Sequence, residues 1–279
     1  MSDLSTLVAA TPEIRPKEFI ALRDYVYKTF GLELRDGKER LVTARLGKHM
    51  RTGGFRTFEQ YIRHVQSDST GDSLVSLIDA LTTNHTHFMR EPEHFKFLLT
   101  NILPQMRRRP SFTIWSAASS TGEEPYSILF SLLDALGGAS VPDVRIVATD
   151  ISTRVLSAAR EGIYTAERVR LLPPAWLQKF FTPTDKRKEN FQVRPEFRSK
   201  VEFRRLNLME PLPASMRHPV IFCRNVMIYF NKQTQAALVR RLAGVLEPEG
   251  HLMVGHSESL TGLDQPLKYI CPAVYRKTT

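Results

Sequence analysis

The sequence predicts an all-helical N-terminal domain followed by an α/β domain built on a parallel sheet. Up to about residue 80, apolar residues recur at helical spacing and β-branched runs are few. From about Pro110, short strand-like runs alternate with helical stretches, which is typical of a parallel sheet with helices on both faces. From Glu167 to Arg205 the alternation stops, and 11 basic residues stand against 5 acidic ones. We therefore expect an inserted subdomain in that stretch.

Four helices are predicted in the first domain. Pro16 suits the start of the first helix and Gly31 its end. The second runs from about Lys38 to Thr52, where two glycines follow. Apolar residues at helical spacing mark the third and fourth helices, namely Phe58, Tyr61, Ile62 and Val65, and then Leu74, Leu77, Ile78 and Leu81.

The second helix is predicted to be amphipathic with a basic outer face. Val42, Leu46 and Met50 fall on one side at about 100° per residue. The opposite side carries the basic residues Lys38, Arg45, Lys48 and His49.

Four strands are predicted in the second domain. They lie within the runs Phe112–Trp115, Val144–Asp150, Val220–Cys223 and His251–Gly255. In the insert, Asn190–Val193 followed by RPEFR indicates a short antiparallel excursion.

The composition fits a soluble globular protein of about two domains. Of the 279 residues 42% are apolar and 24% charged, which excludes collagen, coiled coil and disorder. We find no run of about 20 apolar residues that could span a membrane and no basic start followed by an apolar run. We therefore expect a cytoplasmic protein. Cys223 and Cys271 are too few for a disulfide framework, and we expect both to be buried thiols.

The loop after the first predicted strand indicates a nucleoside cofactor without phosphate. Ligands of open α/β sheets bind at the carboxyl ends of the strands, and Trp115–Ser127 is rich in small residues there. It has one glycine, Gly122, where a dinucleotide fingerprint has three, and Glu123 and Glu124 put negative charge where a phosphate would bind. A cofactor with a positive centre, such as S-adenosylmethionine, fits better, with Asp150 placed to hold its ribose. An ordinary turn is the alternative.

Two further segments carry polar residues suited to a ligand crevice. Thr82–Phe95 holds Asn84, Thr86 and Arg90 just before Pro92. Its histidines, His85, His87 and His94, have no fourth ligand or cysteine cluster nearby, so we predict no metal site.

The second of these segments follows a buried strand. Ile221–Phe230 presents Arg224, Asn225 and then Tyr229 at the end of the strand, and Asn207 stands at the analogous place on another. Polar groups at four strand ends thus converge on one crevice. Tyr229 alone could equally be a core aromatic residue with a satisfied hydroxyl.

These segments, in order and together with GHSES at Gly255–Ser259, closely resemble the chemotaxis receptor glutamate methyltransferases, the CheR family. The resemblance covers nearly the whole chain. It implies a Rossmann-like S-adenosylmethionine methyltransferase domain with a small antiparallel β-subdomain, preceded by an all-helical domain. The implied activity is methylation of glutamate side chains on membrane chemoreceptors, with S-adenosylhomocysteine as the second product. The corresponding ranges are 1–80 for the helical domain, 81–95 for a linker contributing to the cofactor site, and 96–279 for the catalytic domain with an insert at about 167–200.

The resemblance also implies roles for individual residues. The family's contacts with the cofactor fall on Asn84, Thr86, Arg90, Glu124, Asp150, Asn207, Leu208, Arg224 and Asn225. Arg90 and Tyr229 are the pair that the family places nearest the transferred methyl group. Arg45, Lys48 and Arg51 on the basic helix correspond to the receptor-facing surface.

One departure concerns docking on the receptor. Family members that bind a receptor's C-terminal pentapeptide have a glycine-containing loop in the β-subdomain, but Thr182–Asn190 has no glycine. We therefore expect direct recognition of the receptor's cytoplasmic helices.

The net charge of +10 leaves several partners open. Two alternatives are methylation of RNA and a regulatory module that binds the cofactor or a nucleotide second messenger without catalysis. We find no aromatic-rich basic platform of the kind that stacks bases, and Arg90 and Tyr229 argue against lost activity. We expect a monomer that neither binds nucleic acid nor inserts into a membrane, with its surplus charge complementing acidic receptor helices.

Overall fold

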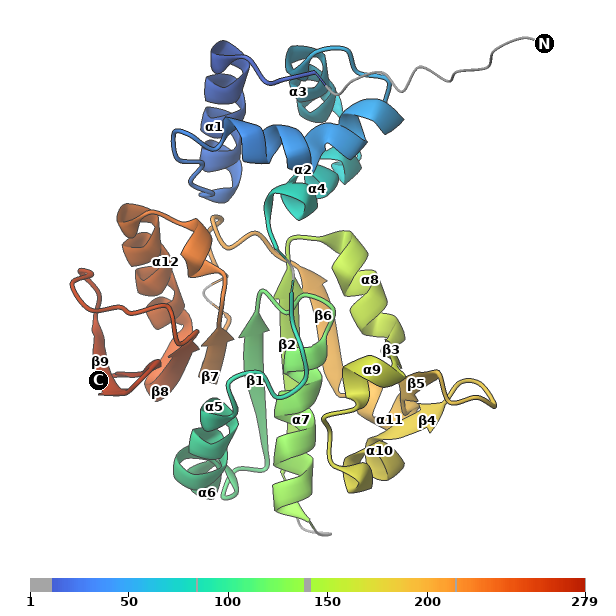
Figure 1. Cartoon of the computed structure of the whole chain (residues 1–279). Helices are drawn as coiled ribbons and strands as arrows, with labels where there is room; N and C mark the ends of the chain where they lie inside the picture. The colour runs from blue at the N-terminus through green and yellow to red at the C-terminus, as the bar shows by residue number, and fades with distance from the viewer. Residues whose placement is uncertain (1–11, 84, 138–141, 214, 279) are drawn as a thin grey trace. The chain divides into compact units, whose positions relative to one another are not determined.

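The computed structural model describes residues 12–83, 85–137, 142–213 and 215–278 (Figure 1). The chain divides into two compact units, Met1–Thr83 and Asn84–Thr279. In the described part of the chain, no helix is both long and apolar enough to cross a membrane.

The first unit contains the four predicted helices. They are α1 (Pro16–Phe30), α2 (Glu39–Thr52), α3 (Phe58–Ser67) and α4 (Asp72–Leu81). Gly31 ends α1 in the left-handed region, at φ 71°, where glycine has no steric penalty. In α4 the buried apolar residues are Val75, Leu77, Ile78 and Leu81, while Leu74 is half-buried.

The second unit is built on a seven-stranded sheet with the order β6-β2-β1-β7-β8-β10-β9. The strands are β1 (Ser111–Ala117), β2 (Asp143–Asp150), β6 (Val201–Arg205), β7 (His218–Cys223), β8 (Leu246–Val254), β9 (Leu267–Cys271) and β10 (Val274–Lys277). From β6 to β8 the neighbouring strands pair in parallel, as predicted. The antiparallel pairs of β10 with β8 and with β9 were not predicted.

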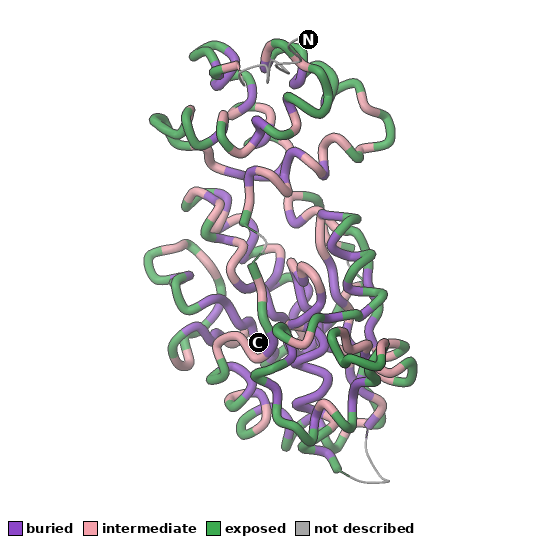
Figure 2. The backbone as a smooth tube through the Cα atoms, turned by 45° about the vertical axis from the view of Figure 1, so that its right-hand side comes forward, coloured by how far each residue is buried: buried purple, intermediate pink, exposed green. Residues whose placement is uncertain are grey.

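Helices cover both faces of this sheet, and the buried residues concentrate along its strands (Figures 1 and 2). Alternate residues of β1 enter opposite cores, since Ile114 belongs to one apolar cluster and Trp115 to the other. The first core includes residues of α7 (Glu123–Leu136) and α8 (Thr153–Glu161), and the second those of α12 (Lys232–Val245). Before β1, α5 (Pro92–Phe97), the π-helix η1 (Leu98–Ile102) and α6 (Leu103–Met106) join the first core. The central strands β1 and β7 are therefore buried on both sides.

The insert forms a separate three-stranded antiparallel sheet with the order β3-β5-β4. Its elements are β3 (Ile163–Thr165), α9 (Ala166–Val169), α10 (Pro174–Phe180), β4 (Phe181–Pro183), β5 (Asn190–Val193) and α11 (Pro195–Arg198). The sheet thus begins before Glu167. RPEFR contributes a helical turn because Pro195 fits the first helical position, and Val201–Arg205 pairs with β2 in the main sheet.

The two cysteines differ in environment. Cys223 is buried in β7, as predicted, but Cys271 is only half-buried. Its strand β9 is an edge of the sheet, so the prediction of a fully buried thiol was wrong there.

Replacing Phe130 by alanine should destabilise the second unit by about 3–5 kcal/mol, the usual cost of removing a buried phenyl ring. Phe130 of α7 is fully buried and stacks on Phe180 of the insert, with ring centroids 4.2 Å apart. Urea unfolding would measure the loss. Leu171→Ala is the matched control, because Leu171 lies in the insert, as Phe180 does, but is 78% exposed. Equal stability of the two variants would contradict the packing described.

Candidate functional site

The predicted ligand crevice corresponds to the carboxyl ends of β1 and β7, where the strand order reverses. Ala117 at the end of β1 is level with Thr149 of β2 and with Cys223 of β7. Because these strands are parallel, the segments after them begin side by side. This is the switch point at which open α/β sheets bind ligands.

Arg224 joins three segments of this crevice. Its side chain is 1% exposed, and one amino nitrogen of the guanidinium lies 2.8 Å from a carboxylate oxygen of Glu124 at the start of α7. The other donates to Glu91 at 3.0 Å and to the carbonyl oxygen of Arg90 at 2.5 Å. The two residues predicted as separate cofactor contacts, Glu124 and Arg224, therefore bind each other, and Glu91 is a partner that the sequence did not indicate.

This largely buried cluster has a formal charge of −1 when both carboxylates are ionised, from one guanidinium and two carboxylates. Burial would raise the pKa of Glu91, but Arg224 and hydrogen bonds from Asn225 and His256 hold it below its ordinary value. Burial raises the pKa of Glu124, and Arg224 opposes that rise. A negative site beside the small-residue loop suits a ligand with a cationic centre, such as the sulfonium of S-adenosylmethionine, better than a phosphate.

Glu258 of the GHSES segment organises the loop after β7. Its carboxylate accepts hydrogen bonds from the backbone N–H groups of Asn225 at 2.8 Å, Gly255 at 2.7 Å and Ile228 at 3.2 Å. A Cβ atom at Gly255 would lie 2.5 Å from the side-chain amide nitrogen of Asn225. The resemblance used this segment without giving Glu258 a role. The signal available in the sequence was an acidic residue three positions after a glycine, and the structure shows that this glycine is required by lack of space for a side chain.

Asp150 connects the loops after β1 and β2. One carboxylate oxygen accepts the backbone N–H of Ser120 at 2.9 Å, and the other that of Ser152 at 3.0 Å. Asp150 therefore ties the two loops together, and its contact with the ribose remains a prediction.

Asn207 and Leu208 follow β6. The Asn207 side chain accepts the backbone N–H of Met209 at 3.0 Å, and Leu208 is buried in the second core. The carbonyl oxygen of Leu208 accepts a hydrogen bond from Arg241 at 2.7 Å, and a cofactor contact by Asn207 or Leu208 remains a prediction.

Of the predicted catalytic pair, Arg90 lies beside the buried cluster and Tyr229 ends the short 3-10 helix η2 (Met227–Tyr229). The Arg90 guanidinium, which is half-buried, donates to the carbonyl of His85 at 2.9 Å. That the two side chains meet at the transferred methyl remains a prediction. Thr86 is half-buried, and the predicted contact at Asn84 lies outside the described residues.

Backbone strain gathers around the crevice. Several residues other than glycine take positive φ there, namely Met89, Glu91, Ala118, Ser120 and Asn225, at 48° to 66°. Each costs free energy and persists only where its surroundings enforce it. The hydrogen bonds of Arg224, Glu258 and Asp150 supply that enforcement at Glu91, Asn225 and Ser120.

The three histidines considered for a metal do not form one group. Among the described residues, His94 instead lies near Glu91 and His256, with possible ligand atoms within 4.8 Å of one another. The Glu91 carboxylate already accepts hydrogen bonds from Arg224, Asn225 and the backbone of His256, so its oxygens are not available as metal ligands. We assign no metal to this group.

In the first unit, the predicted recognition residues differ in environment: Arg45 makes hydrogen bonds within the unit, whereas Lys48 and Arg51 are exposed. Arg45 donates to the carbonyl oxygen of Leu81 and, at 3.2 Å, to the hydroxyl of Thr83, so it fastens α2 to the end of α4. Lys48 and Arg51 are exposed. Receptor contact by all three remains a prediction.

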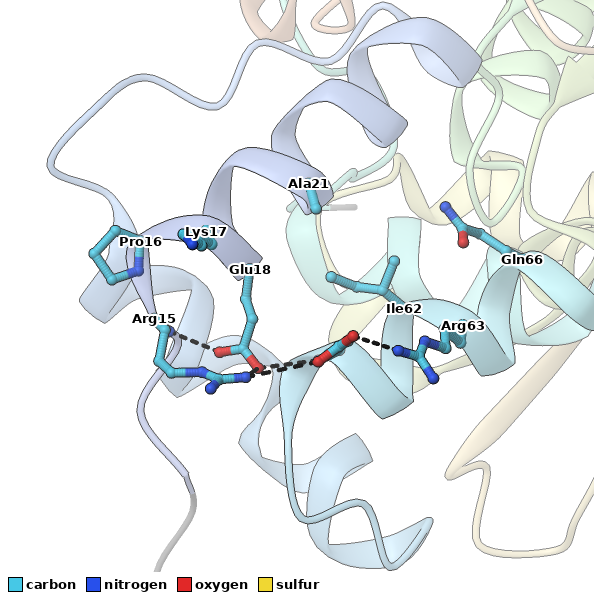
Figure 3. Close-up of a pocket in the computed structure, with 9 residues that line it drawn as sticks. Arg15, Pro16, Lys17, Glu18, Ala21, Ile62, Arg63 and Gln66 are labelled. Carbon is cyan, nitrogen blue, oxygen red and sulfur yellow. Dashed lines mark hydrogen bonds and ion pairs between the residues drawn. The ribbon is translucent and has the colours of Figure 1, made fainter.

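The first unit also has a hollow between α1 and α3, lined by Arg15, Lys17, Glu18, Glu59, Ile62, Arg63 and neighbouring residues (Figure 3). Arg15, Glu18, Glu59 and Arg63 are linked there by ion pairs. The predicted recognition residues of α2 do not line this hollow.

Comparison with known proteins assigns both units. Residues 84–274 match the family model described as CheR methyltransferase, SAM binding domain, and residues 17–82 match the one described as CheR methyltransferase, all-alpha domain. The chain is 39% identical to the chemotaxis protein methyltransferase of Borreliella burgdorferi, covering 95% of each. It is 39% identical to chemotaxis protein methyltransferase 2 of Pseudomonas aeruginosa, covering 93% of this chain and 92% of that protein. For the Salmonella typhimurium protein of the same description, identity is 40% over 85% of this chain and 82% of that protein.

Replacing Arg224 by methionine should cost about 3–5 kcal/mol of stability, because two buried carboxylates lose their counter-charge. It should also abolish S-adenosylhomocysteine binding. Denaturant unfolding and calorimetric titration would measure the two effects. In the control Arg240→Met, the lost pair with Asp264 is largely exposed, so the change should stay within about 1 kcal/mol. Intact binding by the Arg224 variant would refute the organising role of this residue.

Proposed function

The chain belongs to the CheR methyltransferase family, and on that premise we propose that it methylates glutamate side chains on the cytoplasmic helices of chemoreceptors. It is an S-adenosylmethionine-dependent methyltransferase of chemotaxis, and the glutamate acceptor and the receptor are our proposal. The products would be a glutamate methyl ester and S-adenosylhomocysteine. The cluster of Arg224, Glu91 and Glu124 at the strand ends fits the cationic methyl donor, and the observation that carries the acceptor proposal is the exposed basic face of α2.

For this reaction the main task of the enzyme is to position the reacting groups. A glutamate side chain with an ordinary pKa near 4.3 is already an anion at neutral pH, so its oxygen needs no general base. The sulfonium carbon is equally ready to react. Holding oxygen, methyl carbon and sulfur in line can therefore supply most of the acceleration. We assign Arg90 to orient the incoming carboxylate and Tyr229 to direct its oxygen or shape the methyl channel.

The exposed face of α2 is basic and partly apolar, which favours an acidic helix as the substrate. Arg40, Leu41, Ala44, Lys48 and Arg51 are exposed on α2, and Leu41 is 43% exposed. Between Lys38 and Arg56 there are six basic residues and one acidic residue. Such a face attracts a glutamate-rich helix and raises the rate of encounter.

We also propose that this enzyme does not require a C-terminal tether on its receptor. The connection between β4 and β5 is closed by Asp185, whose carboxylate accepts the backbone N–H groups of Glu189 and Asn190, both at 3.0 Å. Lys188 takes a positive φ of 56° in this loop, a conformation that glycine usually adopts.

Incubation with radiolabelled S-adenosylmethionine and receptor-containing membranes tests the acceptor. Label should enter the receptor and leave as methanol after mild base, because a carboxyl ester is base-labile. Receptors lacking their last five residues should be labelled at a similar rate, and Arg90→Ala should transfer no label. Base-stable label, or label on added RNA in place of receptor, would overturn the proposal.

Methylation should slow steeply with added salt, and Lys48→Ala should weaken that dependence. Lys48 is exposed on the basic face of α2, and salt screens charge interactions beyond about 8–10 Å. At low salt we expect the variant to turn over roughly threefold more slowly, with the gap closing at high salt. Initial rates at several salt concentrations would show this. Lys268→Ala is the control, because Lys268 is exposed on β9, away from α2 in the sequence. If the salt dependence of the Lys48→Ala rate runs parallel to that of wild type, docking through α2 is contradicted.

A further inference from the structure

The insert reaches directly into the loop that follows β1. Glu123, in the first turn of α7, has a fully buried carboxylate. One of its oxygens accepts a hydrogen bond from Arg168 of α9 at 2.6 Å, and the other from the Thr121 hydroxyl at 2.6 Å. A residue of the insert and a residue of the loop thus share one buried acid.

Other contacts from the insert converge on the same turn. Arg168 also donates to the Thr121 hydroxyl at 3.3 Å, and the Tyr164 hydroxyl of β3 donates to the Thr121 carbonyl at 2.8 Å. Gly122 follows at φ 95°, and a side chain there would approach the Tyr164 hydroxyl within 2.8 Å and the Ala159 side chain within 2.9 Å. The turn is therefore fitted closely to the insert and to α8.

This turn lies between two parts of the cofactor crevice. On one side, the backbone N–H of Ser120 binds Asp150. On the other, Glu124 binds Arg224. A displacement of Thr121–Glu123 would disturb both the predicted ribose contact and the buried negative cluster.

The charges around Glu123 make Arg168 the partner on which this geometry depends. Burial raises the pKa of Glu123, whereas the Thr121 hydrogen bond, Arg168 and His87 lower it. Tyr164 faces the same carboxylate, and its own pKa is well above the ordinary value because of burial and of Glu123. Arg168 carries the positive charge nearest to Glu123 at neutral pH, at 2.6 Å.

We propose that Arg168 is a positioning residue for the methyl donor: by pairing with Glu123 it fixes the turn at Thr121–Glu123, so the antiparallel subdomain controls cofactor affinity. This role rests on the proposed function, because it assumes that the crevice binds S-adenosylmethionine. It gives the insert a task separate from any contact with a receptor.

The test is calorimetric titration of the whole protein with S-adenosylhomocysteine between pH 6 and pH 9. We expect Arg168→Gln to bind roughly tenfold more weakly near neutral pH. Without Arg168 the pKa of Glu123 rises further, so the pH below which affinity falls should move upward. Arg168→Lys should restore most of the affinity. Arg170→Gln, an exposed change two residues away, should bind like wild type.

A second variant keeps the proposal falsifiable if Arg168→Gln folds poorly. Glu123→Gln keeps the size of the side chain but removes its charge, and it should also weaken binding and remove the acid-side dependence. In this background the Arg168 change should have little further effect. Unaltered affinity in either single variant, or a loss that is the same at every pH and is not rescued by lysine, would overturn the proposal. Normal cofactor binding without receptor methylation would instead contradict only the proposed acceptor.

Discussion

The arrangement of the crevice depends on one buried guanidinium. Arg224 binds Glu91 and Glu124 and also the backbone of Arg90, so it joins the segment before α5, the start of α7 and the end of β7. A buried ion pair adds little net stability, because desolvation offsets most of its attraction, but removing one partner is costly. The interaction therefore specifies a single arrangement more than it stabilises the fold. Glu258 completes that arrangement by holding the backbone of Asn225.

Local patterns predicted much of the fold, and long-range pairing set the rest. The helices of the first unit and the parallel strands follow from apolar periodicity, from Pro16 and Gly31, and from the alternation of strand and helix. The sequence also placed Glu124 and Arg224 after the ends of neighbouring strands, where the structure pairs them, while their contact with a cofactor remains a prediction. It did not indicate that Arg224 binds Glu124 and Glu91, because these partners are 100 and 133 residues away. The strands β9 and β10 were missed because they are short and lie in antiparallel order at one edge of an otherwise parallel sheet.

The basic residues of α2 show why charge alone could not assign roles. Arg45 and Lys48 are both basic residues of one helix. The Arg45 guanidinium donates to the carbonyl oxygen of Leu81 at the end of α4, whereas Lys48 is exposed. An arginine can satisfy carbonyl groups at a helix end because its planar guanidinium offers several donors. The surplus of positive charge is therefore partly structural, and only its exposed part is available to steer an acidic helix.

The two acids at the start of α7 decide what kind of ligand the loop can hold. In a phosphate-binding loop the N–H groups of the helix start remain free for the ligand. Here Glu123 and Glu124 lie at that positive end, and each is paired with an arginine, Arg168 and Arg224. The sequence suggested simple repulsion of phosphate, but the pairing removes most of the negative charge. With Glu91 included, a net charge of −1 remains in the Arg224 cluster. A single cationic centre balances that charge, whereas the several negative charges of a pyrophosphate would add to it. We therefore propose that the same few side chains both hold the loop and favour the sulfonium.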